Sequence, residues 1–219
     1  MKLEQLKKHR RRSRLLNGIF GRNPVFVGGM ALPLVIIATT NLKNAAAISL
    51  LVACATLPAV LFASVLGQRM PDWAAPPFYA LFTMILVLTS VPVLGLISPE
   101  VTDSLGIYTA LVSVNTMTLS LCSHHAGDQA NPLLALIDGV TYSIGFALAA
   151  LLVAALREAF GTNTIWGVPL KLPFRIYGLQ LAYSGFILVA LLSACFRFLR
   201  RLAYQLLYRH ENPFSEETS

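Results

Sequence analysis

The sequence predicts an all-α integral membrane protein with six transmembrane helices. Of its 219 residues, 56% are hydrophobic and only 12% are charged, whereas a soluble domain has about 25% charged residues. The apolar residues form long runs separated by short polar segments, and runs of about 17 to 25 such residues span a bilayer. Backbone polar groups have no water partners in lipid, so the spans of this chain must be helices.

Six apolar segments qualify as spans. They are approximately Pro24–Thr40, Ala45–Leu66, Pro77–Ile97, Ser104–Leu121, Pro132–Leu156 and Leu179–Leu199. The membrane domain therefore covers residues 23–201. A basic N-terminal segment, 1–22, precedes it and a C-terminal tail, 202–219, follows it.

The first and fourth spans differ from the others. The first is short and contains Gly28, Gly29 and Pro33, and the fourth is the most polar, with "LVSVNTMTLSLC" at 111–122. Such segments break into half-helices where protein surrounds them. With one broken span at the start of each half, the sequence predicts a 3+3 repeat. Three spans per half make the halves inverted in the membrane. The remaining spans are continuous, with Pro58 and Pro92 as candidate kinks.

The distribution of Lys and Arg predicts that both termini are cytoplasmic. Residues 1–22 hold eight of the 17 basic residues, and Arg197, Arg200, Arg201 and Arg209 follow near the C-terminus. Basic residues favour the cytoplasmic side of short loops, and an even number of spans agrees. The loop after the third span is acidic, as expected outside. The loop after the fifth span is also placed outside, although it contains bases.

The basic N-terminal segment has two interpretations. It attracts anionic lipid and fixes the topology, or it docks a partner protein. No small-residue cleavage site follows the first span, which argues against a signal peptide. The chain is expected to contact the lipid bilayer and not nucleic acid.

Three ionisable residues near membrane depth are candidates for an ion path. Asp138 lies early in the fifth span, and it either lines such a path or bonds to a neighbouring helix end. Arg157 and Glu158 end the same span, where adjacent opposite charges usually anchor a helix to nearby loops. Asn115 and Thr116 in the fourth span are further polar candidates for the path or for structural bonds.

The three cysteines form no metal-binding motif. Cys54 and Cys195 are interpreted as small buried residues, and Cys122 adjoins "SHHAGD" at 123–128. A metal site at His124, His125 and Asp128 is a minor alternative. No metal ligand, nucleophile motif or phosphate-binding loop is predicted, so we expect the chain alone to be non-catalytic.

Three blocks resemble a known family. "NPVFVGGMALPLVIIATTNLKNA", "DSLGIYTALVSVN" and "ALIDGVTYSIGFALAALLVAALREAFG" are similar, in order and spacing between 23 and 161, to the first, fourth and fifth spans of RnfE/NqrD-type membrane subunits. The basic N-terminus and the "LREAFG" block favour this type over the paralogous RnfA/NqrE type. The resemblance implies a prokaryotic inner-membrane complex that couples electron transfer to sodium or proton translocation. It also implies pairing with an RnfA/NqrE-type subunit and the other subunits of the complex.

The resemblance also implies a cofactor that this sequence does not match. In the family, a cysteine in each broken span ligates an intramembrane iron–sulfur cluster, and thiolates are its usual ligands. Here Leu32 and Thr116 occupy those positions. Cys122 lies six residues beyond Thr116, roughly 9 Å along a helix. We therefore expect no cofactor in this chain alone and consider the family cluster doubtful.

Three functional hypotheses follow. The first is a divergent subunit of an Rnf/Nqr-like ion-translocating complex, a redox-driven translocase. The second is a cluster-free transporter module for a small solute or ion, with a site between the broken spans. The third is a membrane anchor for a soluble redox partner.

Overall fold

The computed structural model describes residues 23–71, 73–97, 106, 108–126, 131–170 and 173–211. The main helices are α2 (Leu32–Ala38), α3 (Leu42–Leu66), α4 (Ala75–Ile97), α6 (Tyr108–Leu111), α7 (Thr116–His125), α8 (Pro132–Arg157) and α9 (Ala182–Glu211). Short 3-10 turns are η2 (Gly67–Arg69) and η4 (Tyr177–Gln180), and a π-helical turn, η3 (Glu158–Thr162), extends α8. The antiparallel strands β1 (Thr164–Ile165) and β2 (Val168–Pro169) form one small hairpin.

Within the part of the chain that the structure describes, four helical segments are long and apolar enough to cross a membrane. They are Leu42–Arg69, Ala75–Pro92, Pro132–Thr162 and Ala182–Leu202. They coincide with the predicted second, third, fifth and sixth spans, so the prediction of a helical membrane protein is confirmed. Helices α3 and α4 continue through Pro58 and Pro92, and α9 continues to Glu211, beyond the predicted end of its span.

The predicted first and fourth spans are not single membrane-length helices. Residues 23–31 form successive turns before the seven-residue α2 begins. The four-residue α6 and the ten-residue α7 are separated by residues 112–115. Both interruptions fall where the sequence places glycine, proline or polar side chains among apolar ones.

Asparagine side chains start the two central helices. Asn41 accepts a hydrogen bond from the Asn44 N–H at 2.8 Å, and Asn131 accepts one from the Leu133 N–H at 3.0 Å. Each bond satisfies a backbone donor that the first helical turn leaves free. The ring of Pro132 has no N–H and so fits the first position of α8.

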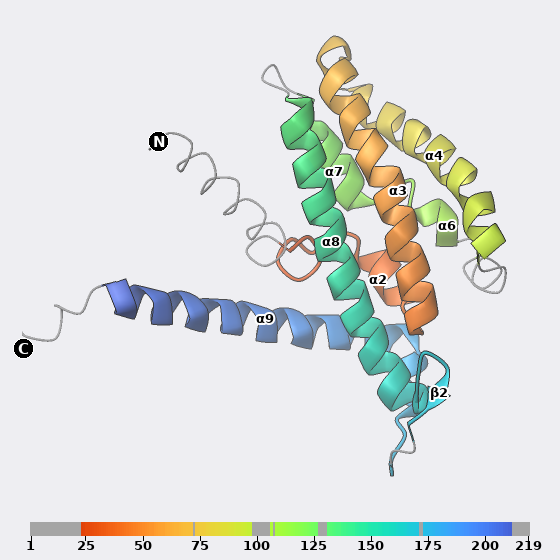
Figure 1. The fold of residues 1–219 in the computed structure, drawn as a ribbon, viewed down its shortest axis with the longest axis vertical. Helices are drawn as coiled ribbons and strands as arrows, with labels where there is room; N and C mark the ends of the chain where they lie inside the picture. The colour runs from red at the N-terminus through yellow and green to blue at the C-terminus, as the bar shows by residue number, and fades with distance from the viewer. Residues whose placement is uncertain are drawn as a thin grey trace, which may run out of the picture.

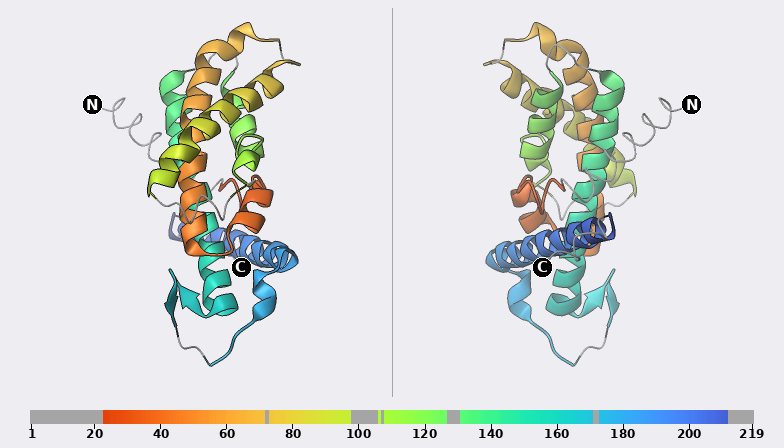
Figure 2. Two further views of the ribbon diagram at one scale, coloured as in Figure 1. Left: turned by 90° about the vertical axis from the view of Figure 1, so that its right-hand side faces the viewer. Right: turned by 90° about the vertical axis from the view of Figure 1, so that its left-hand side faces the viewer.

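Helices α3 and α8 lie side by side at the centre of the molecule, and α4 lies on the other side of α3 from α8 (Figure 1). In the apolar 18-residue stretch of each helix, 56% of α3 and 50% of α8 is buried, against 17% of α4 and 11% of α9. Helix α9 runs crosswise to both central helices (Figures 1 and 2). The outer helices therefore expose apolar side chains that suit lipid or another membrane subunit.

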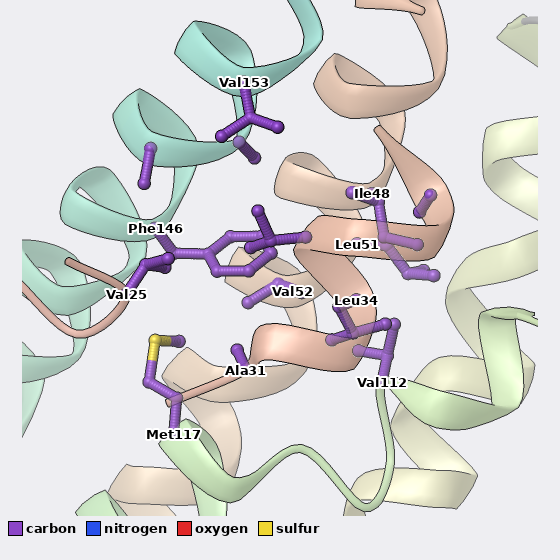
Figure 3. Packing of buried hydrophobic residues seen from close by; sticks show 14 of the residues in the cluster. Val25, Ala31, Leu34, Ile48, Leu51, Val52, Val112, Met117, Phe146 and Val153 are labelled. Atoms are coloured by element: carbon purple, nitrogen blue, oxygen red, sulfur yellow. The ribbon is translucent and has the colours of Figure 1, made fainter. Parts of the chain in front are cut away.

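The larger hydrophobic cluster lies where the broken segments meet the central helices (Figure 3). Val25 and Leu34 come from the first segment, Val112 and Met117 from the fourth, and Phe146 from α8. A smaller cluster of Val60, Tyr79, Leu121, Cys122 and others joins α3, α4 and α7. The interrupted segments are therefore internal parts of the fold.

The two ends of the molecule carry exposed aromatic side chains. Trp73 lies between η2 and α4 and is 83% exposed, and Trp166 lies in the turn of the hairpin and is 53% exposed. The segment that joins α3 to α4 and the hairpin lie at opposite ends of α3 and α8 (Figures 1 and 2).

Candidate functional site: the paired helix breaks

The two interrupted segments meet through a hydrogen bond. The Ala31 N–H, at the start of α2, donates to the Thr116 hydroxyl, at the start of α7, with 3.0 Å between the heavy atoms. Ala31 has a φ of 59°, a left-handed conformation that is uncommon for alanine. The fold thus brings together the first residues of α2 and α7, which are Leu32 and Thr116.

Asn115 and its neighbours shape the fourth-segment break. The Asn115 side chain accepts a hydrogen bond from the Met117 N–H at 3.1 Å and so caps α7. Ser113 donates to the Ala110 carbonyl at 2.6 Å. Thr118 shares a buried 2.9 Å hydroxyl contact with Thr56 of α3. Most of the polar stripe therefore supports the interruption and joins it to α3.

One side of the paired helix breaks is exposed. Gly28, Gly29, Pro33 and Thr116 are exposed, and Leu32 is partly exposed. Val114 is 54% exposed. The Asn115 Nδ2 atom is buried and has no partner within the described part of the chain. We call the six residues Gly28, Gly29, Leu32, Pro33, Val114 and Thr116 the break surface.

Asn23 anchors the first break, a role that the sequence interpretation did not assign. Its side-chain oxygen accepts hydrogen bonds from the Val25 and Phe26 N–H groups at 3.0 Å each. Its amide donates to the Gly145 carbonyl of α8 at 2.9 Å. Asparagine before proline, at Asn23-Pro24, is a turn signal in the sequence. No local sequence pattern indicates the long-range hydrogen bond from Asn23 to α8.

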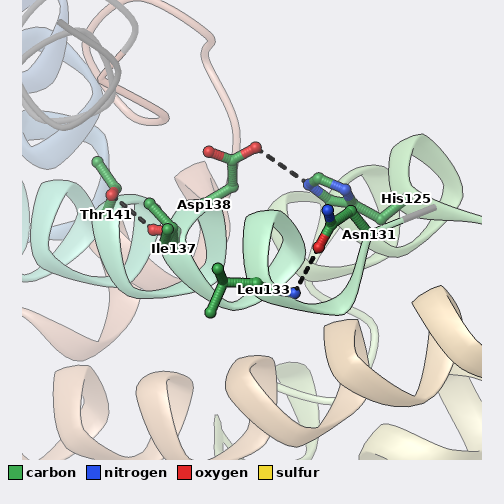
Figure 4. A network of polar contacts seen from close by, with 6 residues as sticks. All are labelled: His125, Asn131, Leu133, Ile137, Asp138 and Thr141. Atoms are coloured by element: carbon green, nitrogen blue, oxygen red, sulfur yellow. Dashed lines mark hydrogen bonds and ion pairs between the residues drawn. The ribbon is translucent and has the colours of Figure 1, made fainter. Parts of the chain in front are cut away.

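Asp138 bonds to the end of a neighbouring helix (Figure 4). Its Oδ2 lies 3.1 Å from Nε2 of His125, the last residue of α7. His125 also makes an edge-to-face contact with His124. Of the two alternatives for Asp138, a helix-end contact and an ion path, the observed contact favours the first.

Arg157 and Glu158 lie at the opposite end of α8 and bond mainly to backbone. Arg157 is only 1% exposed and donates to the carbonyls of Ile36 at 2.5 Å, Leu179 at 2.9 Å and Gln180 at 3.0 Å. Glu158 accepts from the N–H groups of Leu42 at 2.7 Å and Gly167 at 3.0 Å. The pair thus binds both sides of the α2–α3 junction, which supports the anchoring interpretation.

The structure corrects the interpretation of two cysteines. Cys54 and Cys195 were expected to be buried, but both are exposed, and Cys122 is the buried one. Cys54 and Cys195 lie on helix faces that point away from the core, where lipid tolerates an apolar thiol. Cys122 belongs to the smaller cluster, apart from the break surface.

The donors at the breaks do not suit an iron–sulfur cluster. The leucine side chain at 32 has no donor atom, and the Thr116 hydroxyl already accepts the Ala31 N–H. The described residues also contain no group of three His, Cys, Asp or Glu side chains placed to hold a metal ion. Asp128, the third member of the alternative His124 and His125 site, lies outside the described residues.

Comparison with known proteins identifies the family. Residues 12–203 match the model of the Rnf-Nqr subunit, membrane protein, family. A Na(+)-translocating NADH-quinone reductase subunit from Aeromonas salmonicida is 25% identical over 156 residues, which cover 71% of this chain and 74% of that protein. The corresponding subunit from Serratia proteamaculans is 23% identical over 193 residues, covering 85% of this chain and 92% of that protein. With nearly its whole length matched, the chain belongs to the Rnf-Nqr family of membrane subunits.

Proposed function

We propose that the protein is a membrane subunit of an Rnf/Nqr-type complex that couples electron transfer to sodium or proton translocation. The observation that carries this proposal is the meeting of two interrupted segments at an exposed surface, in a chain that matches the family over 12–203. The named relatives are subunits of sodium-translocating NADH-quinone reductases. On this proposal the chain is a scaffold or ion-path component, and catalysis belongs to the whole complex.

The arrangement of elements supports an inverted 3+3 repeat. Each half has an interrupted segment, then a long Asn-capped helix, then an outer apolar helix. The ends of the two central helices make related contacts. Gly67, after α3, adjoins Ala126 at the end of α7, and Arg157, at the end of α8, bonds to Ile36 near the end of α2. An inverted repeat relates these contacts to each other.

The break surface is our candidate interface for an RnfA/NqrE-type paralogous subunit. Gly28 and Gly29 have no side chains that would hold a partner's backbone away, and close approach at small residues is common between membrane helices. Val114 offers an exposed apolar contact. The Asn115 Nδ2, for which the described residues supply no partner, lies beside this surface, and a buried donor of this kind is costly without a partner.

The orientation proposed for the complex follows the charge distribution. Both termini lie in the cytoplasm of a prokaryotic cell, and the hairpin lies on the outer side of the inner membrane. The eight basic residues in 1–22 support the first placement. The exposed Trp166 suits an aromatic side chain at a membrane–water interface.

Copurification tests the interface. The tagged full-length chain, extracted from its own host in mild detergent, should retain the paralogous subunit. Val114→Trp adds bulk at the break surface and should release that subunit. The matched control is Leu88→Trp on α4, where the original side chain is 60% exposed but lies outside the break surface. Retention by Val114→Trp with loss by Leu88→Trp would place the interface on α4 instead.

Ion uptake and iron content test the remaining parts of the proposed function. Membrane vesicles from cells with the gene should show sodium or proton uptake driven by electron transfer, and vesicles from a deletion strain should not.

The purified chain separated from its partners should contain neither iron nor acid-labile sulfide. Iron that disappears with Cys122→Ser would contradict our interpretation of the donors. Solute uptake by the reconstituted chain alone, without an electron donor, would favour a transporter module.

A further inference from the structure

Arg197 and Arg201 of α9 lie level with the middle of α8. The Arg197 Nη2 donates to the Val27 carbonyl at 3.1 Å, and the Val27 N–H donates to the Asn23 carbonyl. The Asn23 amide in turn donates to the carbonyl of Gly145, near the middle of α8. Helix α9 runs crosswise to α8 (Figures 1 and 2), so Arg201, one turn further along α9, lies at a similar level.

At this level the two arginines need a counter-charge. Helix α8 belongs to the segment Pro132–Thr162, which is long and apolar enough to cross a membrane, so its middle falls in the hydrocarbon region of a bilayer. A charged side chain there is costly in contact with lipid and normally pairs with another polar group. Among the described residues, neither Arg197 nor Arg201 forms an ion pair. Lipid alone therefore does not suit this face of α9.

The two arginines line a cavity that can admit a side chain from another protein. Its volume is about 530 Å³, and its described lining, which is Val27, Arg197, Arg200 and Arg201, contains no carboxylate. Arg197 and Arg201 are exposed, whereas Arg200 already takes part in another interaction. A guanidinium group can bind a carboxylate through two parallel hydrogen bonds. The cavity therefore offers both space and donors for an aspartate or glutamate side chain.

The surface around the cavity is apolar. On the same stretch of α9, Phe198, Leu199 and Leu202 are 66%, 55% and 43% exposed. Residues 182–196, which precede the arginines, contain no charged residue. A protein segment that covers this face must therefore be apolar apart from its carboxylate, which is the composition of a transmembrane helix with one acidic residue.

A second copy of this chain does not have the required carboxylate. Of its ten acidic residues, only Asp138 lies within one of the six predicted spans. The Asp138 Oδ2 is already 3.1 Å from Nε2 of His125. Glu158, just after the fifth predicted span, is 3% exposed and accepts hydrogen bonds from backbone N–H groups. The counter-charge must therefore come from a different protein.

We propose that a transmembrane helix of another subunit packs against this face of α9 and places an aspartate or glutamate carboxylate at Arg197 and Arg201. This inference rests on the proposed complex, because the helix belongs to one of its other membrane subunits. The partner helix covers the apolar side chains that this half of α9 leaves exposed, and its carboxylate neutralises the charge of the cavity.

Photo-crosslinking from α9 tests the contact. The tagged full-length chain is expressed in its own host with p-benzoylphenylalanine in place of Phe198, which adds only a benzoyl group to an exposed ring. Irradiated membranes should yield an adduct with a membrane subunit. Mass spectrometry should place the crosslinked peptide in a transmembrane segment, within a helical turn of an aspartate or glutamate. The same amino acid in place of Leu88, which is 60% exposed on α4, is the matched control and should not give this adduct.

Charge reversal tests the ion pair. In the crosslinkable chain, Arg201→Asp should lower the adduct yield roughly tenfold or more, because removing one member of a buried charge pair strongly weakens association. Arg201→Lys keeps the charge and should retain most of the yield. Arg69→Asp, at an exposed arginine outside the cavity, should behave as the unmodified chain does. An arginine in place of the partner's carboxylate should restore the adduct with Arg201→Asp, which would not happen if that variant were misfolded.

Four results would overturn the proposal. A phospholipid adduct at position 198, with the other subunits still copurifying, would mean that lipid covers this face and would leave the proposed complex intact. Equal adduct yields from Arg201→Asp and Arg69→Asp would exclude the ion pair. An adduct with a second copy of the chain would assign this face to a homodimer. If no membrane subunit copurified with the unmodified chain, the proposed complex would fail, and this inference with it.

Discussion

The two ends of α8 hold charged side chains in different ways. Near its start, Asp138 contacts one side chain, His125, and both are partly accessible, with 26% and 10% of the side-chain surface exposed. At its other end, Arg157 and Glu158 are buried and bond to carbonyl and N–H groups of four separate segments. A buried charge is tolerated only when its hydrogen bonds are satisfied. The second end therefore organises backbone, whereas the first joins two side chains.

The largest expected effect is at Arg157. Arg157→Leu fills similar space but leaves the Ile36, Leu179 and Gln180 carbonyls without their donors. Each buried unsatisfied group costs about 1 to 3 kcal/mol, so the free energy of unfolding should fall by about 3 kcal/mol or more. Thermal unfolding in detergent, followed by circular dichroism, measures this. Arg175→Leu is the control, because the exposed Arg175 donates to the Gly161 carbonyl. Equal losses of unfolding free energy in the two variants would contradict the larger role of the buried arginine.

A smaller effect is expected at Glu158. Glu158→Ala removes the acceptor for the Leu42 and Gly167 N–H groups and should cost about 2 kcal/mol. Glu158→Gln keeps one acceptor oxygen and should cost roughly half as much. Both variants can be compared by the same unfolding measurement. If Gln and Ala were equivalent, the negative charge, and not the number of acceptors, would be the important property.

The hydrogen bond between the two breaks should contribute about 1 kcal/mol to the free energy of unfolding. Thr116→Val removes the hydroxyl that accepts the Ala31 N–H but keeps the shape of the side chain. Thr116→Ser keeps the hydroxyl and should remain close to the unmodified chain. Amide hydrogen exchange at Ala31, measured by mass spectrometry, should accelerate in the valine variant alone. Equal exchange in both variants would mean that this bond does not protect the break.

The smallest effect is expected at the accessible end of α8. Asp138→Asn should lower the free energy of unfolding by no more than about 1 kcal/mol, because a single side-chain hydrogen bond contributes about that much. His125→Ala in the same background should add little further, since both changes remove one interaction. A loss as large as that for Arg157→Leu would mean that this pair has a structural role similar to that of the buried one.

Local composition was sufficient to predict much of the fold. The four long helices follow from continuous apolar runs, whereas the capping roles of Asn41 and Asn131 were not predicted. Gly28, Gly29 and Pro33 indicated the first interruption, and the polar composition of 111–122 indicated the second. These residues act through the conformation of their own segment, so a single sequence is enough to interpret them.

Contacts between distant segments were not predictable in the same way. The Ala31–Thr116 bond joins residues 85 positions apart, and Arg157 reaches Ile36 across 121 positions. The exposure of Cys54 and Cys195 depends on which helix face meets the bundle, and uniformly apolar helices do not mark that face. The positions of Leu32 and Thr116 at one site were implied only by the family resemblance.

The exposed tryptophans give the molecule an intrinsic fluorophore at each end. The chain contains two tryptophans, Trp73 and Trp166, and they lie in segments at opposite ends of α3 and α8. Trp73→Phe leaves one emitter beside the hairpin, and Trp166→Phe leaves one beside α4. Quenchers confined to the inside or the outside of sealed vesicles would then read the insertion direction of the chain without any added dye.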